Sequence, residues 1–490
     1  MTQRRHAPFL IGGKWVEAVD GNVITVRNPA NGGAAGTSAY GGAADADLAL
    51  AAAHAAFPAW SATDVEIRAK LLRRSGALIR ERRMEIAEAL TSEQGKPITD
   101  SLREIDYTAR VFEFYADMAP LRSDGWKHPQ ENAMSKELRV LVIHQPIGVA
   151  VTMVPWNYPV DIFAWKVAPA LAAGCTVVNK PSPLTPLSTM LVVKCLVDAG
   201  IPEGVINNVV GTNEELSHKL LTDPRSRMIT LTGSIETGRL VMREAAAELK
   251  RIVLELGGQC PMIVMPDADI ELAVAAAVQR SYTNMGQICL SINRVYVANE
   301  IRSKFIEAFV EATKAVKPMD GMLPGALFGP MINDAQITRV EQHVLDATSR
   351  GGRLLVGGER LKGSGYDGGS FYAPTVLADV PDDALVMCEE TFGPVAPVVG
   401  YASTEEVIRR ANATRFGLAA YVYSQDAGQA LQLAERLECG GVGINVNDVC
   451  ELQAPFGGWK HSGVGRELGS EGLLSYMESK HIRMRLPALR

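Results

Sequence analysis

The chain has 490 residues, of which 47% are hydrophobic and 21% are charged. This length and composition predict a globular protein with a large buried core and more than one domain. The chain contains 49 Lys and Arg residues and 55 Asp and Glu residues, so its formal net charge is −6. This charge provides no basic field for nucleic acid or anionic lipid. We therefore expect a small-molecule partner, with no nucleic acid and no membrane.

The seven cysteines are odd in number, and no two are closer than 11 positions. This spacing offers neither a C-x-x-C metal pair nor a dense disulfide framework, so we expect a reducing cytoplasmic location and no metal site. The first residues, MTQRRHAPFLIGGKW, make a poor signal peptide. The most apolar long segment, 160–178, contains Asp161 and Lys166, which argues against a membrane span.

Helical periodicity dominates the first part of the chain. The stretches LALAAAHAAFPAW (48–60) and AKLLRRSGALIRERRMEIAEALTSEQ (69–94) carry charges on one face, and the second is expected to end at Gly95 before Pro97. The polar segment 123–139 follows and is predicted to be a loop or an excursion that pairs with another subunit.

From about residue 147, short apolar runs alternate with helical segments. These runs are IGVAVTMVPW, CTVVNKPS, INNVVG and MITLTG. The alternation predicts a parallel sheet covered on both faces, which is a doubly wound α/β domain. Such sheets bind ligands at the carboxyl ends of their strands, where NKPS, VVGTN and LTGS lie. A second alternation after ELGGQCPMIVMPDADI predicts another α/β domain.

Three side chains could carry chemistry. Cys289, in GQIC, is by itself either a small core residue or a nucleophile. Glu255 ends an apolar run directly before Leu-Gly-Gly, where a carboxylate either acts on a ligand or is simply solvated. Asn157 lies in PWNYP, where its amide either donates to an oxyanion or stabilises its own turn.

Two strand ends could hold a nucleotide. Gly233 and Ser234 lie between a strand and a helix, whose first N–H groups are free to bind a pyrophosphate. Lys180 ends another strand and could bind a ribose hydroxyl or a phosphate, although exposed lysines are usually only solvated. The spacing is not G-x-G-x-x-G, so neither feature alone identifies a cofactor.

The motifs PWNYP, NKPSPLTP, TGSIETG, ELGGQCP, GQIC, EETFGPV and APFGGWKHSGVGREL occur in this order over nearly the whole chain. In this respect the chain resembles the aldehyde dehydrogenase superfamily. The resemblance implies two doubly wound α/β domains, a Rossmann-like cofactor domain (1–123 and 147–258) and a catalytic domain (259–473). It also implies a small β oligomerisation arm (124–146 and 474–490), and with it a homodimer or homotetramer.

The same resemblance implies a mechanism. Cys289 would add to the aldehyde carbon, while the Asn157 amide and the Cys289 backbone N–H stabilise the oxyanion. Glu255 would activate the water that hydrolyses the resulting thioester to the acid. A rival interpretation is a structural relative without catalytic activity, but the presence of all three residues argues against it. A second rival is a CoA-acylating enzyme, in which CoA and not water takes the acyl group. The presence of the general base Glu255 disfavours that interpretation.

The cofactor implied by the resemblance is NAD or NADP. The expected cofactor-binding residues are Trp156, Lys180, Ser182, Pro183, Gly233, Ser234, Leu256, Glu390 and Phe392. Many strictly NAD-using relatives carry a Glu at the position of Pro183, where it repels a 2′-phosphate. Pro183 removes that repulsion and leaves NAD versus NADP open.

The general motifs are similar to the succinic semialdehyde dehydrogenase branch, which binds its substrate's carboxylate with two arginines. Trp165 and Thr283 occupy those positions here. We therefore expect a mostly apolar tunnel and an aliphatic or aromatic aldehyde, with Glu451 near the mouth as a feature that favours cations. Succinic semialdehyde or another short polar aldehyde is the alternative. The expected tunnel residues are Tyr158, Ile162, Trp165, Ile288, Leu290, Cys450 and Phe456.

Overall fold

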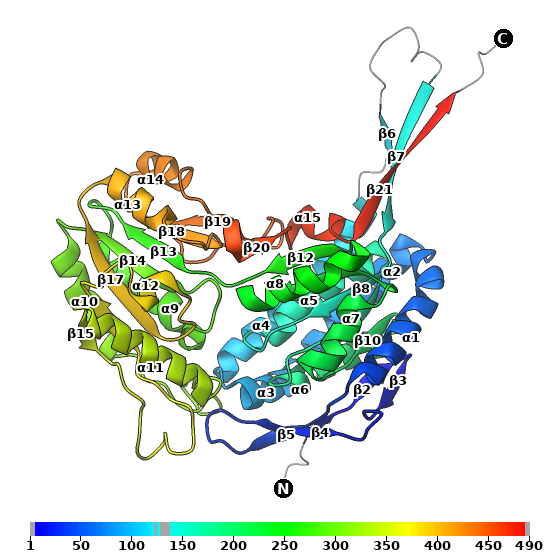
Figure 1. The fold of residues 1–490 in the computed structure, drawn as a ribbon, viewed down its shortest axis with the longest axis horizontal. Helices are drawn as coiled ribbons and strands as arrows, with labels where there is room; N and C mark the ends of the chain where they lie inside the picture. Colours follow the sequence, from blue (N-terminus) through cyan, green and yellow to red (C-terminus); the bar gives the residue numbers. More distant parts are fainter. Residues whose placement is uncertain (1–4, 122–124, 128–137, 486–490) are drawn as a thin grey trace.

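The computed structural model describes residues 5–121, 125–127 and 138–485 (Figure 1). Two large sheets form the body of the molecule. Two smaller three-stranded sheets lie outside them, one at the N-terminal edge and one in a projecting arm.

The first large sheet has eight strands. In spatial order they are β20 (Gly463–Val464), β12 (Arg251–Glu255), β11 (Ser226–Thr232), β8 (Val149–Met153), β9 (Thr176–Lys180), β10 (Ile206–Asn208), β2 (Phe9–Ile11) and β3 (Lys14–Val16). The five strands from β12 to β10 are parallel, as the alternating apolar runs predicted. All five residues of β8 are buried, which is typical of a strand covered on both faces.

Helices cover both faces of this sheet. One face packs against α1 (Ala43–Ser61), α7 (His218–Thr222) and α8 (Ile235–Ala245). The other packs against α5 (Pro159–Ala173) and α6 (Pro186–Ala199), behind which lie α2 (Val65–Glu81), α3 (Arg83–Gln94) and α4 (Ile98–Met118). The expected single helical stretch over 69–94 is thus two helices. The chain bends at Arg82, where φ is −94° and ψ is 14°.

The second large sheet has seven strands. In order they are β15 (Arg353–Val356), β16 (Thr375–Ala378), β17 (Val395–Tyr401), β14 (Ile292–Ala298), β13 (Cys260–Val264), β18 (Ala419–Tyr423) and β19 (Gly441–Ile444). Only the edge strand β15 runs antiparallel to its neighbour. This sheet confirms the second α/β unit.

Helices again cover both faces. One face packs against α9 (Ile270–Tyr282) and α10 (Arg302–Lys314). The other packs against α11 (Asp334–Ser349), α12 (Leu385–Cys388), α13 (Thr404–Asn412) and α14 (Ala427–Ala434). Short helical turns occur at η1 (Ala119–Leu121), η2 (Asn213–Ser217), η3 (Ala246–Glu248), η4 (Thr283–Gly286) and η5 (Lys460–Ser462).

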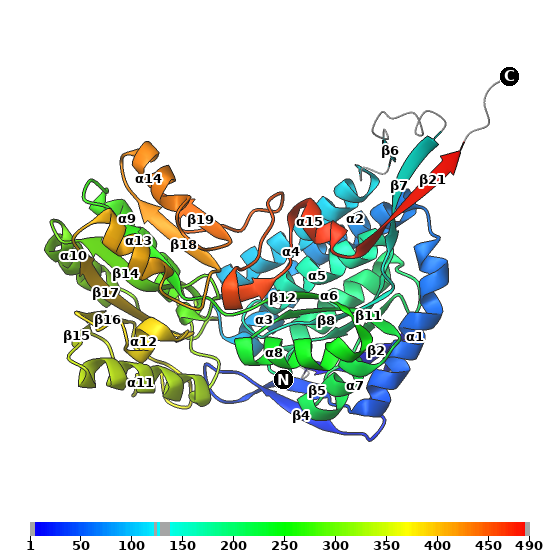
Figure 2. The same ribbon diagram turned by 45° about the horizontal axis from the view of Figure 1, so that its top comes forward.

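The arm consists of β21 (Met477–Arg485), β7 (Leu138–Pro146) and β6 (Gly125–Lys127), which are antiparallel (Figures 1 and 2). It projects from the end of the body that carries α2 and α15 (Gly469–Leu474). The expected C-terminal strand is therefore confirmed from Met477 onward, while 474 still belongs to α15. The parts of the predicted arm at 124, 128–137 and 486–490 lie outside the described residues.

The predicted domain boundaries stay a prediction. The strands of the two large sheets come from opposite sides of residue 258 in the sequence, with one exception. The strand β20 comes from the predicted catalytic segment, yet it pairs with β12 in the eight-stranded sheet. The N-terminal sheet contains β1 (Arg5–Ala7), β5 (Ala34–Ala39) and β4 (Val23–Arg27). Across the described residues, no helix has both the length and the apolar character that crossing a membrane requires.

The C-terminus of α3 gives a test of packing. Gly95 ends this helix with φ of +96°, and a Cβ there would lie 2.6 Å from Pro330 Cγ and 2.7 Å from Pro29 Cγ. Gly351 has the same φ, but a Cβ there would meet nothing within 4 Å. Both alanine variants share a backbone cost of about 1–2 kcal/mol. Gly95→Ala adds overpacking, so its free energy of unfolding should fall by about 2 kcal/mol more.

Urea unfolding of the two variants, followed by circular dichroism, measures this difference. An equal loss in Gly95→Ala and Gly351→Ala would show that the contact with the two prolines does not matter.

Candidate active site

Two cavities meet at three side chains in the body of the molecule. The first, of about 440 Å³, lies at the carboxyl ends of β8, β11 and β12. The second, of about 330 Å³, lies between α4, α5, α9 and the loop that precedes β14. Asn157, Glu255 and Cys289 line both cavities. The tertiary structure therefore brings together the three residues that the sequence marked as candidates for catalysis.

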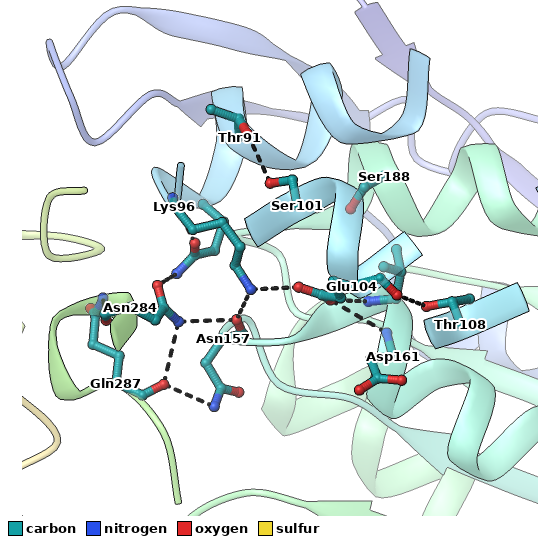
Figure 3. Close-up of polar contacts among 12 residues, drawn as sticks. Thr91, Lys96, Ser101, Glu104, Thr108, Asn157, Asp161, Ser188, Asn284 and Gln287 are labelled. Atoms are coloured by element: carbon teal, nitrogen blue, oxygen red, sulfur yellow. Dashed lines mark hydrogen bonds and ion pairs between the residues drawn. The ribbon is translucent and has the colours of Figure 1, made fainter. Parts of the chain in front are cut away.

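Asn157 is held in the loop between β8 and α5 by contacts from distant segments (Figure 3). Its side-chain Nδ2 donates to the Gln287 carbonyl at 3.1 Å. Its own carbonyl accepts from Lys96 Nζ at 2.7 Å and from Asn284 Nδ2 at 3.2 Å. These bonds fix the position of the amide at the junction of the cavities.

A buried ion pair extends this network toward α5 (Figure 3). Lys96 Nζ lies 2.5 Å from Glu104 Oε2, and each of these side chains is only 1% exposed. Glu104 Oε1 accepts from the backbone N–H groups of Val160 and Asp161 in the first turn of α5. A carboxylate at a helix N-terminus also interacts favourably with the helix dipole. The pair therefore fixes the start of α5 and the Asn157 loop together.

The loop before Cys289 has an unusual backbone. Asn284 and Met285 adopt left-handed φ values of 49° and 55°, and both are buried. Gln94 Nε2 donates to Asn284 Oδ1 at 2.9 Å, and Gln287 Nε2 donates to the Asn284 carbonyl at 2.8 Å. These side-chain amides hold a conformation that Asn tolerates better than most residues.

Glu255 ends β12 and is 2% exposed. Its Oε1 is buried and has no hydrogen-bond partner among the described residues. The pKa of Glu255 is raised to about 8, mainly by burial and then by nearby Glu467, while Lys166 opposes the rise. Burial and the Glu255 carboxyl raise the pKa of the Cys289 thiol well above its ordinary value. At neutral pH the resting site thus holds a thiol beside a largely protonated carboxyl.

Six of the expected cofactor residues line the first cavity. They are Trp156, Gly233, Ser234, Leu256, Glu390 and Phe392. The other three are not part of this lining: Lys180 is the last residue of the neighbouring strand β9, and Ser182 and Pro183 follow it. The strand end LTGS therefore lies at the cavity, whereas NKPS lies beside it.

All seven expected tunnel residues line the second cavity, namely Tyr158, Ile162, Trp165, Ile288, Leu290, Cys450 and Phe456. Thr283 lines it as well, but Glu451 does not. The sequence did not predict the other polar residues there, which are Asp100, Arg103, Glu104, Tyr107, Asp161, Gln279, Arg280 and Asp448. The cavity is thus apolar near Cys289, but it contains more polar side chains than the mostly apolar tunnel that we expected.

Comparison with known proteins identifies the family. The family model described as "Aldehyde dehydrogenase family" matches residues 15–482. The chain belongs to the aldehyde dehydrogenase family.

Its relatives match along almost the whole chain. The mitochondrial succinate-semialdehyde dehydrogenase of Arabidopsis thaliana is 41% identical over 96% of this chain and 88% of the relative. The NADP⁺-dependent succinate-semialdehyde dehydrogenase of Escherichia coli (strain K12) is 40% identical over 96% of both chains. A crystal structure of betaine aldehyde dehydrogenase from Staphylococcus aureus with NAD⁺ is 36% identical, with a TM-score of 0.95 over 98% of this chain and 96% of that one. Family membership confirms the fold, the oxidation of an aldehyde and the use of NAD(P).

The first cavity of this aldehyde dehydrogenase fits a nicotinamide dinucleotide. Ser234 caps α8 and accepts from the Thr237 N–H, so the first N–H groups of this helix face the cavity where a pyrophosphate would bind. Glu390, which accepts from the Gly258 N–H at 3.0 Å, offers a carboxylate to ribose hydroxyls. A Cβ at Gly257 would lie 2.3 Å from Glu390 Oε2, so this close approach requires glycine.

The sequence reasoning missed the residues that support the catalytic ones. Gln94, Lys96, Glu104, Asn284 and Gln287 are all fully or nearly fully buried. Lys96 lies between Gly95 and Pro97, a pattern that resembles an ordinary helix end. Only the contact of Lys96 with the Asn157 carbonyl reveals the role of this lysine. Asn284 and Gln287 lie next to Cys289 in sequence and could have been found from that proximity.

The pKa of Glu255 predicts how thioester hydrolysis depends on pH. Below about pH 8 the carboxyl is largely protonated and cannot accept a proton from water, so the hydrolysis rate should rise from pH 6.5 and level off near pH 9. Rapid-quench measurement of acyl-enzyme decay across this range tests the expectation. A rate that is already constant from pH 6.5 upward would show that Glu255 is not the base or is ionised at neutral pH.

Proposed function

We propose that this chain oxidises its aldehyde through a covalent thioester on Cys289, which water then hydrolyses to the carboxylic acid. The observation that carries the proposal is that Asn157, Glu255 and Cys289 line both cavities. A substrate in the second cavity and a nicotinamide ring in the first would therefore meet at the sulfur.

In the first step, the Cys289 sulfur forms a bond to the aldehyde carbon, and its proton passes to Glu255 in the minor fraction of the enzyme in which this carboxyl is ionised at neutral pH. The carbonyl oxygen becomes an oxyanion, to which the Asn157 Nδ2 and the Cys289 N–H donate. NAD(P)⁺ held in the first cavity by residues such as Ser234 and Glu390 would supply the acceptor for the hydride of this carbon. Loss of that hydride leaves a thioester on Cys289.

Before the second step, Glu255 releases the proton that it took from Cys289 to solvent. The ionised Glu255 then accepts a proton from a water molecule, whose oxygen forms a bond to the thioester carbon. The carbon–sulfur bond then breaks, which releases the acid and the Cys289 thiolate. The buried and unpartnered Oε1 of Glu255 supports this role, because a buried carboxylate oxygen without a protein partner favours a water as its donor.

We propose that the substrate carries no negative charge at its far end. Trp165 and Thr283 line the second cavity at the two positions where the semialdehyde branch is expected to have arginines. Burying a carboxylate without a cationic partner costs several kcal/mol. The apolar part of the cavity instead favours an aliphatic or aromatic chain.

A semialdehyde is the second candidate, and two observations favour it. Several relatives are named as succinate-semialdehyde or glutarate-semialdehyde dehydrogenases. Arg280 also lines the second cavity, one helical turn from Thr283. However, Arg280 Nη2 already pairs with Asp448 at 3.0 Å, and its Nε donates to the Asn447 carbonyl. A substrate carboxylate would have to displace or share these partners.

We also propose a cytoplasmic homodimer or homotetramer. The seven cysteines form no disulfide, which fits a reducing compartment. The projecting arm exposes Ile482 and Met484 on β21, which are apolar residues that a second subunit would cover. The cofactor in this proposal is NAD or NADP, because Pro183 carries no charge that would repel a 2′-phosphate.

The catalytic assignment predicts two different mutant phenotypes. Cys289→Ala should abolish aldehyde oxidation while the affinity for NAD(P)⁺ changes only a few-fold, because the sulfur is needed for chemistry and not for cofactor binding. Glu255→Gln should release one equivalent of NAD(P)H in a burst and then stall, with an acyl group on Cys289 that mass spectrometry detects. Wild-type turnover in either variant would refute the assignment.

The substrate proposal predicts an effect of charge. The kcat/KM for hexanal should exceed that for succinic semialdehyde by at least tenfold, and kcat/KM for linear aldehydes should rise with length until the cavity is full. Each buried methylene contributes roughly 0.8 kcal/mol. If succinic semialdehyde is better by tenfold or more, the arginine that receives it is Arg280, and Arg280→Gln should then remove the advantage.

A further inference from the structure

Four carboxylates besides Glu255 line the substrate cavity, and three of them have a cationic partner. The three pairs are Asp100 with Arg103 at 2.8 Å, Glu104 with Lys96 at 2.5 Å, and Asp448 with Arg280 at 3.0 Å. The two arginines that line the cavity, Arg103 and Arg280, are both used in these pairs.

The fourth carboxylate, Asp161, has no ion pair within the part of the chain that the structure describes. It lies in the first turn of α5, where its Oδ1 accepts from Trp165 Nε1 at 3.0 Å. That neutral indole bond holds the side chain in place but does not balance its charge. No described residue donates to Oδ2. When Asp161 is ionised, it is therefore the one of these four carboxylates whose charge no neighbouring cation among the described residues balances.

The walls near Asp161 suit a cation. Tyr158, Trp165 and Phe456 line the same cavity, and the rings of Trp165 and Phe456 pack edge to face at 5.1 Å. Aromatic faces attract ammonium groups, whereas they repel carboxylates. The Tyr158 ring already has Lys96 Nζ 3.7 Å from its centroid, so this ring attracts a cation within the folded protein.

We propose that Asp161 is a specificity-determining residue that selects aldehydes with a positive charge at the end remote from the carbonyl, such as ω-ammonio aldehydes. This inference rests on the proposed function, because it assumes that the aldehyde carbon reaches Cys289 through the second cavity. It deepens that function by naming the charge of the substrate's far end.

The groups that face Asp161 act on its ionisation. They are Glu104 and Tyr107 on α4, Lys96 before α4, Tyr158 before α5, and Asp448 and Cys450 after β19. Burial raises the pKa of Asp161 well above its ordinary value, and Glu104 raises it further, against the opposing effect of Lys96. A bound ammonium group would lower this pKa again. The preference for a cationic aldehyde should therefore increase with pH while the substrate's ammonium group stays protonated.

The test compares 3-aminopropanal with butanal, which has the same number of heavy atoms in its chain but no charge. In the wild-type protein, kcat/KM for 3-aminopropanal should exceed that for butanal by at least tenfold at pH 7.5. Asp161→Asn keeps an acceptor for Trp165 Nε1 but removes the charge, so this ratio should fall at least tenfold. Effects of the variant on the chemical steps cancel in the ratio.

Asp117→Asn is the matched control, because it removes a charge from the exposed part of α4, where Asp117 pairs with Arg73 outside the cavity. Its ratio should stay within twofold of wild type. An equal fall in both variants would mean that only the overall charge matters, and it would overturn the role of Asp161. A wild-type ratio of one or less would also overturn it.

A second measurement needs no variant. Propylammonium should inhibit wild-type butanal oxidation competitively at a concentration at least tenfold lower than 1-propanol does, and equal inhibition would contradict the proposal. Failure of this inference is distinct from failure of the proposed function. If butanal is oxidised without preference for the amine, only the inference fails. If Cys289→Ala oxidises butanal at the wild-type rate, the proposed function itself fails.

Discussion

The buried pair of Lys96 and Glu104 is the interaction on which the geometry of the active site depends. It joins two parts of the chain that are far apart in sequence, residues 96–104 and 157–161, because Lys96 also bonds to the Asn157 carbonyl and Glu104 to the first turn of α5. Two ions lose their hydration when they are buried in this way, so such a pair adds little net stability unless every polar atom is bonded. Here Lys96 and Glu104 use further polar atoms to hold the backbone of the Asn157 loop and the first turn of α5. Loss of either partner would leave an uncompensated charge beside Asn157.

Burial also sets the chemistry of the site. Because Glu255, Glu390 and Cys289 are largely surrounded by protein, burial favours the neutral forms of these acids and raises their pKa values. A resting site with few negative charges suits the entry of a dinucleotide, which carries two phosphates. It also means that only a minor fraction of the protein holds Glu255 ionised at neutral pH. The unpartnered oxygen of Glu255 has the same origin, since the fold provides a place for water but no protein donor.

The substrate cavity shows how one scaffold can change its specificity. The relatives named for semialdehydes and the relative named for betaine aldehyde are all at least 36% identical to this chain. The fold is thus shared at this level of identity, and in this chain residues on α4, α5 and α9 contribute the charged side chains of the second cavity. In this chain the cavity residues include more carboxylates than arginines, and Asp161 is, besides Glu255, the one left without a cationic partner among the described residues.

The sequence by itself determined the elements, their layering and the reacting groups. Buried strands and amphipathic helices are encoded by local patterns, and motifs such as GQIC and PWNYP mark Cys289 and Asn157 because they are contiguous. The bend at Arg82 escaped prediction because a helical pattern continues through it. Only the tertiary structure decided which polar residues reach the cavities: Asp100 and Asp161 line the second one, whereas Glu451 does not. Such placements depend on how helices from distant parts of the chain pack together, and no local pattern of residues encodes that contact.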